Sequence, residues 1–401
     1  MKLPIYMDHH ATTPVDPRVL EAMLPYFSEK FGNAASVTHM FGWEAEAVVE
    51  HARRQIAQAI GAQPKEIIFT SGATEADNLA LKGVVRAAAD RGNHIIVSAI
   101  EHKAVWDCAR RLEHEGVSVT YLPVNHEGLV DPEDVRRAVT DRTALISVIY
   151  ANNEIGIIQP IRAIGQIARE RGVPFHTDAA QAIGKIPVDV VADNIDLLSL
   201  SAHKTYGPKG VGALYVRGGR PRVHLAPLLD GGGHERGLRP GTLPVPLIVG
   251  FGVAVEIAVR EMLSESPRLA ELRDRLMHAI MENLDGVFLN GALSPRLPNN
   301  LNLSFAAVEG EAILMGLKID VALSSGSACS SATVEPSHVL AALGVTEELA
   351  HASIRFGLGR SNTADEVDHV AGRVVEAVQR LRNISPLYQT AHPVGSNNSE
   401  T

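Results

Sequence analysis

One lysine stands where an apolar segment of the sequence runs out into a turn rich in glycine and proline. The apolar segment is residues 195–200, and Lys204 lies in the SAHKTYGPKG stretch that follows it. A lysine at the end of a buried strand is costly unless it is paired or used chemically, and a Schiff base with pyridoxal phosphate (PLP) is one such use. If the strand continues, Ser201 and His203 share a face and could hold a phosphate together. The alternative is a solvated lysine in a surface turn, which an isolated His-Lys pair favours.

Two other polar residues also follow apolar segments. Asp178 comes directly after residues 174–177, and an acid there would be expensive unless it faced a cation. Beside the pyridine nitrogen of PLP it would keep that nitrogen protonated and make the cofactor an electron sink, whereas a helix-capping aspartate is the alternative. His102 follows residues 94–99, at the kind of strand end where open α/β sheets bind ligands. An exposed histidine with no role would show the same pattern.

The segment FTSGATEADN predicts a binding site for an anion. Residues 66–70 are typical of a strand, Ser71-Gly72 of a turn, and a helix is expected from Thr74 to residue 89. The free backbone amides and the positive dipole end of such a helix favour a phosphate, and the Thr74 hydroxyl adds a donor. The segment lacks the Gly-Lys-Ser/Thr of a Walker loop, and an ordinary capped helix is the alternative.

The chain has two cysteines in contrasting surroundings. Cys108 lies inside a helical pattern beside Trp106, which predicts a buried structural thiol. Cys329 lies in SSGSACSSA, whose small residues predict a mobile, exposed loop. An exposed thiol in a chain with so few cysteines suggests a nucleophile, and an incidental surface cysteine is the alternative. Two cysteines give no disulfide framework and cannot hold a metal or iron-sulfur cluster alone, and the adjacent His9 and His10 point in different directions, so no metal site is expected.

Composition excludes several classes of protein. The chain has 401 residues, 45% hydrophobic and 21% charged, which is ordinary for a globular protein large enough for two domains. A net charge of −9 argues against nucleic acid or anionic lipid as a partner. The longest apolar stretch, residues 243–255, is too short to span a bilayer and is broken by proline and glycine. With no secretory signal and few cysteines, we expect a cytoplasmic protein that binds neither membranes nor nucleic acid.

Strand and helix patterns alternate through the first half of the chain, as in a mixed α/β sheet. Seven strands are expected, at residues 66–70, 94–99, 117–123, 143–150, 174–177, 195–200 and 211–217, with helical patterns at 18–27, 43–60, 74–89, 132–139, 161–171 and up to 115. A glycine-rich stretch at 231–237 is expected to be a functional loop or a disordered link. A long helix from 247 and a charged helical pattern to 283 lead to a second domain with strands at 300–305 and 353–357.

Read in order, the motifs resemble those of one family. DHHATTP, FTSGATEADN, EHKAV, NNEIG, HTDAAQ, SAHKTYGPKG, GGGHERG, GTLPV, SSGSACSSA, EPSHVL and IRFGLGR follow one another as in the cysteine desulfurases of the NifS/IscS type. The resemblance covers all but the carboxyl-terminal tail. It implies the PLP-dependent transferase fold of aspartate aminotransferase, in the class V aminotransferase family. The large domain, with a seven-stranded mixed sheet, would be residues 15–260, the small α+β domain 1–14 and 261–385, and 386–401 a disordered tail.

The resemblance also assigns the cofactor site. Lys204 would form the Schiff base, Asp178 would pair with the pyridine nitrogen, and His102 would stack on the ring and transfer protons. Gln181 would hydrogen-bond the phenolic oxygen. Contacts with the phosphate would come from Ala73, Thr74, Ser201, His203 and, from the other subunit of a homodimer, Thr242. The pair His9-His10 and the residue Pro240 depart from the residues common in the family, and neither is assigned a chemical role.

The substrate implied by the resemblance is L-cysteine. Arg355 and Asn153 would fix its carboxylate, with Asn153 also beside the cofactor, and Cys329 would attack its sulfur to leave L-alanine and an enzyme persulfide. The sulfur would pass to acceptor proteins such as an iron-sulfur scaffold, for cluster assembly or other sulfur transfer. A selenocysteine lyase or aminotransferase of the same fold is one alternative, and Cys329 argues against it because transamination needs no second nucleophile. A binding protein without turnover is another, and Lys204 argues against that.

Overall fold

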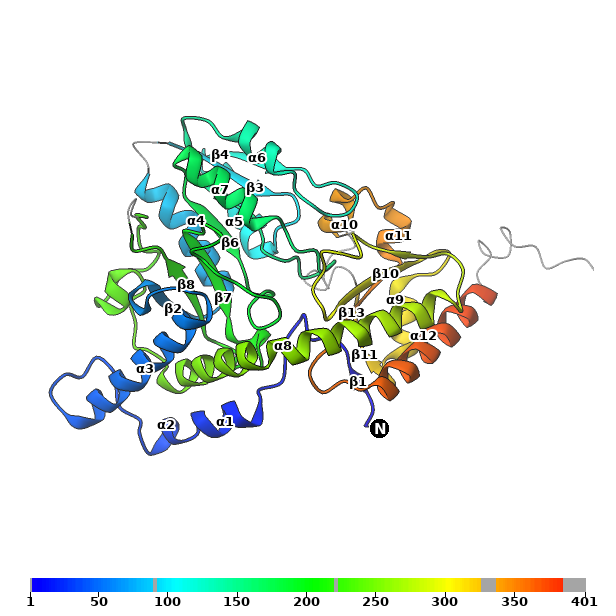
Figure 1. Ribbon diagram of the computed structural model, residues 1–401, viewed down its shortest axis with the longest axis horizontal. Helices are drawn as coiled ribbons and strands as arrows, with labels where there is room; N and C mark the ends of the chain where they lie inside the picture. The colour runs from blue at the N-terminus through cyan, green and yellow to red at the C-terminus, as the bar shows by residue number, and fades with distance from the viewer. Residues whose placement is uncertain (1, 89–91, 220–222, 326–336, 385–401) are drawn as a thin grey trace, which may run out of the picture.

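The computed structural model describes residues 2–88, 92–219, 223–325 and 337–384. It shows a larger body built on a seven-stranded sheet and a smaller body built on a four-stranded sheet (Figure 1). The long helix α8, Val245–Met281, runs along both of them (Figure 1). No helix in the described ranges is long and apolar enough to cross a membrane.

All seven strands expected for the large sheet are present. They are β2 (Ile67–Thr70), β3 (His94–Ser98), β4 (Ser118–Leu122), β5 (Thr143–Ser147), β6 (Phe175–Asp178), β7 (Leu197–Ser201) and β8 (Gly212–Val216). The spatial order is β2-β8-β7-β6-β5-β3-β4, and only the pairs made by β8 are antiparallel. Parallel neighbours need crossover connections, which helices such as α4 (Ala73–Ala87), α5 (Lys103–His114), α6 (Pro132–Ala138) and α7 (Ile161–Arg171) supply. The fold class inferred from the motifs is confirmed.

Both faces of the large sheet are covered by helices. On one face, Ile95 and Val97 of β3 pack in an apolar cluster with residues of α4 and α5. On the other, Ile96 packs in the cluster that contains residues of α3 (Met40–Ala59), α7 and the first half of α8. Because neither face meets water, the strands carry nearly continuous apolar runs. This is why the strands could be located from the sequence.

The small body has its own apolar cluster. Its sheet has the order β12-β13-β10-β9, all antiparallel, from β9 (Val287–Leu289), β10 (Asn300–Phe305), β12 (Ser324–Ser325) and β13 (Ser353–Gly357). Side chains of α9 (Gly310–Leu317), α12 (Ala364–Ile384) and the second half of α8 pack against this sheet, together with Ile5 and Met7 from the amino-terminal end. The division at residues 14–15 and 260–261 stays a prediction, since one further apolar cluster contains residues from both sides of it, such as Ile155 and Leu340.

Helix α8 joins the two clusters without a break. Its first half buries Phe251 in the large cluster and its second half buries Leu276 in the small one. Pro267 lies between them inside the helix, where it removes one backbone donor without ending the helix. The long helix expected from residue 247 and the charged helical pattern up to residue 283 are thus parts of one helix.

Two further expectations need correction. The helical pattern at 18–27 is divided into α1 (Pro17–Met23) and α2 (Pro25–Ser28), because Pro25 begins a new helix. The glycine-rich stretch is not a disordered link, since it forms the short helix η3 (His234–Gly237) and buries the side chain of Glu235. Glu235 and Arg236 have φ values of 46° and 57°, in the left-handed region that non-glycine residues rarely adopt.

Candidate active site

The residues proposed for the site come from one edge of the large sheet. Strands β3, β5, β6 and β7 run parallel, so their carboxyl ends lie at the same end of the sheet. Asp178 is the last residue of β6, and His102, Asn153 and Lys204 lie in the segments that follow β3, β5 and β7. Helix α4, which follows β2, begins at this edge as well, because β2 and β7 both pair antiparallel with β8. This is where open α/β sheets bind their ligands.

The turn that carries Lys204 differs from the extended segment expected from the sequence. Strand β7 ends at Ser201, and Ala202–Lys204 form the short helix η2, closed by hydrogen bonds from the amides of Thr205 and Gly207 to the Ala202 carbonyl, both 3.0 Å. The expectation that Ser201 and His203 share one face of a continuing strand is therefore wrong. Lys204 is half-buried, and its Nζ donates to the carbonyl oxygens of His10 (2.6 Å) and Ala11 (2.8 Å).

Asp178 has the environment of an acid that needs a cationic partner. It is 5% exposed, and burial raises the pKa of its carboxyl group, an effect that the nearby Asp77 carboxyl increases. Its Oδ1 accepts a hydrogen bond of 2.9 Å from the Ala180 amide in the turn that follows β6, where no helix begins, so Asp178 is not the helix cap considered as the alternative. A protonated ring nitrogen placed beside this carboxyl group would favour its charged form. Asp178 therefore fits the pyridine nitrogen of PLP.

A buried polar cluster lies beneath Asp178 and was not found from the sequence. His176, two residues earlier on β6, contacts the hydroxyls of Ser147 (2.8 Å) and Ser199 (3.0 Å). Its Nε2 lies 3.5 Å from Oδ1 of Asp77 on α4. Burial raises the pKa of Asp77 to about 7 and lowers that of His176 to about 4. These groups therefore affect the charge of Asp178 from behind the site.

His102 is held in one tautomer by the helix it begins. It is the residue that caps α5, and its Nδ1 accepts a hydrogen bond of 3.1 Å from the Ala104 amide. A ring nitrogen that accepts carries no proton, so the neutral imidazole has its proton on Nε2. Burial lowers the pKa of His102, and the positive charge of Lys204 lowers it further. The ring is therefore neutral at neutral pH and can hold or give a proton at Nε2.

Arg355 and Asn153 are brought together as expected. Arg355 lies on β13 and is 1% exposed. Its guanidinium donates to the carbonyl oxygen of Asn153 (3.1 Å) and to Oδ1 of Asp8 (2.9 Å), while Nε has no hydrogen-bond partner within the described part of the chain. A buried donor left unsatisfied costs about 1–3 kcal/mol. A substrate carboxylate fits this arginine because it could accept from the remaining donors.

The amino-terminal segment DHHATTP contacts several of these residues, which the sequence reading did not anticipate. His10 Nδ1 lies 3.1 Å from Oε1 of Gln181, and Nε2 of Gln181 donates to the His10 carbonyl (2.9 Å). Thr12 Oγ1 lies 3.0 Å from Nδ1 of His203, and Thr13 Oγ1 donates to the His203 carbonyl (2.9 Å). His9 packs against the small body, where its Nδ1 lies 3.1 Å from the carbonyl oxygen of residue 357. No group of possible metal ligands was found among the described residues.

A second lysine lies behind Lys204. Lys185 Nζ donates to Oε1 of Gln181 (3.3 Å) and to the main-chain oxygen of Lys204 (3.3 Å). Burial lowers its pKa to about 7, and the charge of Lys204 contributes. With His10, this lysine fixes the orientation of the Gln181 amide. The sequence gave no signal for it, because its contacts depend on the turn at η2.

The residues proposed for the phosphate come from three places: Ser201 and His203 from the end of β7 and η2, Ala73 and Thr74 from the start of α4, and Thr242 from the segment after the glycine-rich stretch. Gly72 precedes the helix and provides no side-chain cap, so its first amides are open to a ligand at Ala73 and Thr74. Thr74 and Thr242 are exposed. Arg239, close to Thr242 in sequence, donates from Nε to Oε1 of Glu75 on the first turn of α4 (2.9 Å). This ion pair links the glycine-rich region to the helix start.

Of the two cysteines, only Cys108 lies within the described residues. Cys108 is buried in α5, and burial raises its pKa to about 12, so it is a structural thiol as expected. Cys329, the proposed nucleophile, lies outside the described residues, in the gap between Ser325 and Ser337. Its role therefore depends on the sequence.

The chain is similar to known proteins of one family. The aminotransferase class-V family model matches residues 5–370, and the chain belongs to this family of PLP-dependent enzymes. Relatives named cysteine desulfurase IscS come from Rickettsia africae (strain ESF-5), 56% identical over 97% of this chain and 94% of that protein, and from Anaeromyxobacter sp. (strain Fw109-5), 58% identical over 97% and 96%.

Solved structures of similar proteins share the fold. A NifS-like protein has a TM-score of 0.87 and 39% identity, covering 94% of this chain and all of that one. A structure titled SspA in complex with cysteine has a TM-score of 0.78 and 41% identity, covering 88% and 98%.

Proposed function

We propose that the chain is a PLP-dependent cysteine desulfurase, which converts L-cysteine to L-alanine and leaves the sulfur as a persulfide on Cys329. The observation that carries the proposal is the connection of Lys204, Gln181 and Arg355 through one segment. Asp8 contacts Arg355, and His10, two residues later, contacts both Gln181 and Lys204. A carboxylate-binding arginine is thereby placed beside the lysine that would bind the cofactor.

Each residue has a definable role in this reaction. PLP, when bound, supplies the electron sink that weakens the bond between carbon and sulfur. Arg355 binds the carboxylate of L-cysteine and orients it, Asp178 holds the proton of the ring nitrogen, and His102 holds or gives a proton at Nε2. Nζ of Lys204 is the amine that binds the cofactor aldehyde.

The sulfur transfer balances without an added oxidant or reductant. The thiolate of Cys329 forms a new bond to the substrate sulfur while the carbon–sulfur bond breaks. The electron pair of that bond stays on carbon, which takes a proton to become the methyl group of L-alanine. Cysteine and enzyme thiol thus give alanine and enzyme persulfide. Cys329 is proposed for this step because the buried Cys108 has a pKa raised to about 12 and forms almost no thiolate near neutral pH.

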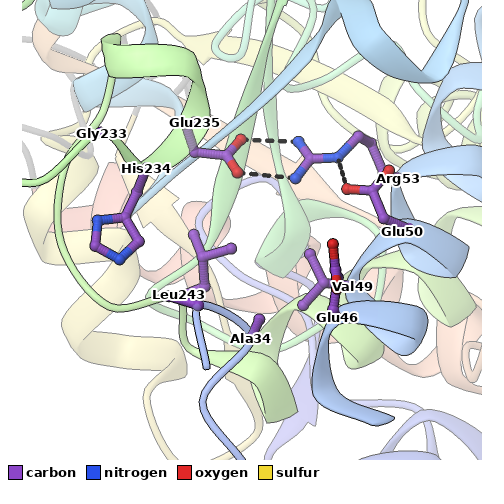
Figure 2. Close-up of a pocket in the computed structure, with 10 residues that line it drawn as sticks. Ala34, Glu46, Val49, Glu50, Arg53, Gly233, His234, Glu235 and Leu243 are labelled. Carbon is purple, nitrogen blue, oxygen red and sulfur yellow. Dashed lines mark hydrogen bonds and ion pairs between the residues drawn. The ribbon is translucent and has the colours of Figure 1, made fainter. Parts of the chain in front are cut away.

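We infer that the active form is a homodimer. The amino-terminal helices and the segment after them expose a group of large apolar side chains, which are Leu20, Leu24, Phe27, Phe31, Val37, Met40, Phe41 and Trp43. Exposed apolar groups of this size are typical of interfaces between proteins. A pocket lined by Ala34, Val49 and Leu243 lies next to them and also contacts the glycine-rich stretch (Figure 2). A second copy covering this region would lie beside Thr242, as the proposed phosphate contact requires.

Light scattering on the active fraction tests the dimer. Phe27→Glu with Trp43→Glu should give a monomer that binds PLP weakly, because two buried charges oppose association. A fully active monomer would contradict this part of the proposal.

We further propose that the persulfide sulfur passes to an acceptor protein, such as an iron-sulfur scaffold, in the reducing cytoplasm. Two cysteines and the absence of a membrane-spanning helix from the described residues support this placement. Transfer of labelled sulfur from the persulfide to a purified scaffold would test it.

The activity itself is tested by incubating the purified protein with L-cysteine and assaying sulfide and alanine together. Equal amounts of both, in the presence of a thiol reductant, would support the desulfurase. An aminotransferase would instead give a keto acid without alanine, and a binding protein would give no product.

A further inference from the structure

In the structure, Arg355 pairs with a carboxylate of the protein itself, that of Asp8. Oδ1 of Asp8 lies 2.9 Å from NH2 of Arg355, in an ion pair whose side chains are 17% and 1% exposed respectively. A guanidinium buried this deeply needs a counter-charge. In the protein without substrate, Asp8 provides it.

The substrate carboxylate is the same chemical group as the side chain of Asp8. Both are planar carboxylates that accept hydrogen bonds from a guanidinium. Nε of Arg355 has no partner within the described ranges, so the arginine keeps donors for a ligand while NH2 contacts Asp8. Two carboxylates on one buried guanidinium repel each other, and only one is needed to neutralise it.

The backbone around Asp8 is fixed independently of this ion pair. The amide of His9 donates to the carbonyl oxygen of Gly357 (3.0 Å), and the amide of Gly357 donates to the Met7 carbonyl (2.7 Å). The side chain of Asp8 can therefore rotate away from Arg355 while residues 7 and 9 keep their pairing with β13. The side chain of Asp8 is already 17% exposed in the ion pair, so solvent can reach its carboxylate when the contact with Arg355 is lost.

We propose that Asp8 is a specificity-determining residue, whose carboxylate holds Arg355 in the substrate-free enzyme and yields that contact to the carboxylate of L-cysteine. The proposal rests on the proposed function, because it takes Arg355 as the substrate-binding arginine. Asp8 then selects for ligands that have a carboxylate, because only such a ligand replaces the contact between Asp8 and Arg355 when that contact is lost. The residue lowers the affinity for L-cysteine and equally for the product L-alanine, which favours product release.

The test compares ligands with and without a carboxylate on Asp8→Asn. Binding is followed by the change in absorbance of the bound cofactor, with L-cysteine, L-alanine and cysteamine, which is cysteine without its carboxylate. Asp8→Asn removes the competing charge, so the apparent dissociation constants of L-cysteine and L-alanine should fall about tenfold. That of cysteamine should change less than about twofold. KM for L-cysteine should fall without a rise in kcat.

Three further variants separate charge from structure. Asp8→Glu keeps the charge and should bind L-cysteine no more tightly than the wild-type protein. Asp8→Ser is a second neutral variant with the same expected result, and it replaces Asp8→Asn in the test if Asp8→Asn does not fold. Glu261→Gln is a control, because it removes a carboxylate on α8 that pairs with the exposed Arg18. It should leave the dissociation constants of all three ligands unchanged.

Weaker or unchanged binding of L-cysteine to the neutral variants would overturn the proposal, and so would an equal change for cysteamine. The same holds if Asp8→Glu matches Asp8→Asn. A wild-type protein that binds L-cysteine and releases no alanine would contradict the proposed function, whereas the ratio of cysteine to cysteamine binding would still decide the role of Asp8.

Discussion

The glycine-rich stretch is expected to depend on one buried carboxylate for its attachment to the large sheet. Glu235 accepts two hydrogen bonds of 2.8 Å from Arg53 on α3 (Figure 2). It accepts a third, of 2.7 Å, from the amide of Phe69. Phe69 lies on β2, an edge strand, and Arg53 also donates to the Ile67 carbonyl of the same strand (2.8 Å). The pair therefore satisfies backbone groups at the open edge of the sheet.

The change Glu235→Gln should be strongly destabilising. The ion-pair side chains are 5% and 2% exposed, so the charge of Arg53 is not replaced by water when the carboxylate is lost. The side-chain amide of the introduced glutamine has only one oxygen acceptor, and its NH2 group faces the donors of Arg53 or Phe69. Breaking a buried ion pair on one side costs about 3–5 kcal/mol. Adding Arg53→Met removes the unpaired charge, so the double variant should lose only about 1–2 kcal/mol.

Chemical denaturation of the cofactor-free proteins measures these differences, as shifts in the denaturant midpoint at constant slope. Glu50→Gln is the matched control, because Glu50 contacts the same arginine at 2.8 Å but its side chain is 43% exposed, and the loss should stay below about 1 kcal/mol. If Glu235→Gln costs no more than Glu50→Gln, or the double variant is the least stable of all, the reasoning is refuted. Cofactor retention should also fall in Glu235→Gln, because the stretch leads to Thr242.

Three other predictions concern the cofactor site. Lys204→Ala should abolish the visible absorbance of bound PLP in the purified protein, and unchanged absorbance would remove the lysine from its assigned role. Thr242→Ala should weaken PLP binding by about 1.5–3 kcal/mol, the contribution of one hydrogen bond to a charged group, as measured by equilibrium dialysis. Burial raises the pKa of Asp178 from 3.8 to about 6, so the folded cofactor-free protein binds a proton there that the unfolded chain has lost, and this contribution to stability decreases as the pH rises from about 4 to 6. Cofactor-free Asp178→Asn should lack that decrease, and equal pH slopes in the denaturation midpoints of both proteins would contradict it.

The fold was predictable because a sheet buried on both faces leaves a simple record in the sequence. Apolar runs indicated the central strands of the large sheet, and a run rich in β-branched and aromatic residues indicated β4, a partly exposed edge strand. Their spatial order was not derivable from the runs themselves, since strands that are apolar on both faces can pair in many ways, and it came from the structure. The helical pattern from residue 247 to 283 indicated the long helix α8, although Pro267 lies inside it, where a proline is ordinarily a sign of a helix end.

The site was predictable to a different extent. Motif residues such as Asp178 and Arg355 were named, but the partners that define their chemistry come from distant parts of the chain. Asp8 contacts an arginine 347 positions later, and Glu235 is buried within a stretch whose glycines indicated only flexibility. The helical turn at His203 replaced an extended one because closing hydrogen bonds to Ala202 are formed in the folded loop. Such contacts depend on tertiary structure and leave no periodic pattern.

The destination of the substrate sulfur is the most direct test of the whole account. The purified protein is exposed briefly to L-cysteine, alanine is quantified, and both cysteines are mapped by mass spectrometry without reduction. The account predicts one alanine for each added sulfur atom, with that atom on Cys329 and none on the buried Cys108. Sulfur on Cys108 alone, or alanine formed with no persulfide on Cys329, would contradict it.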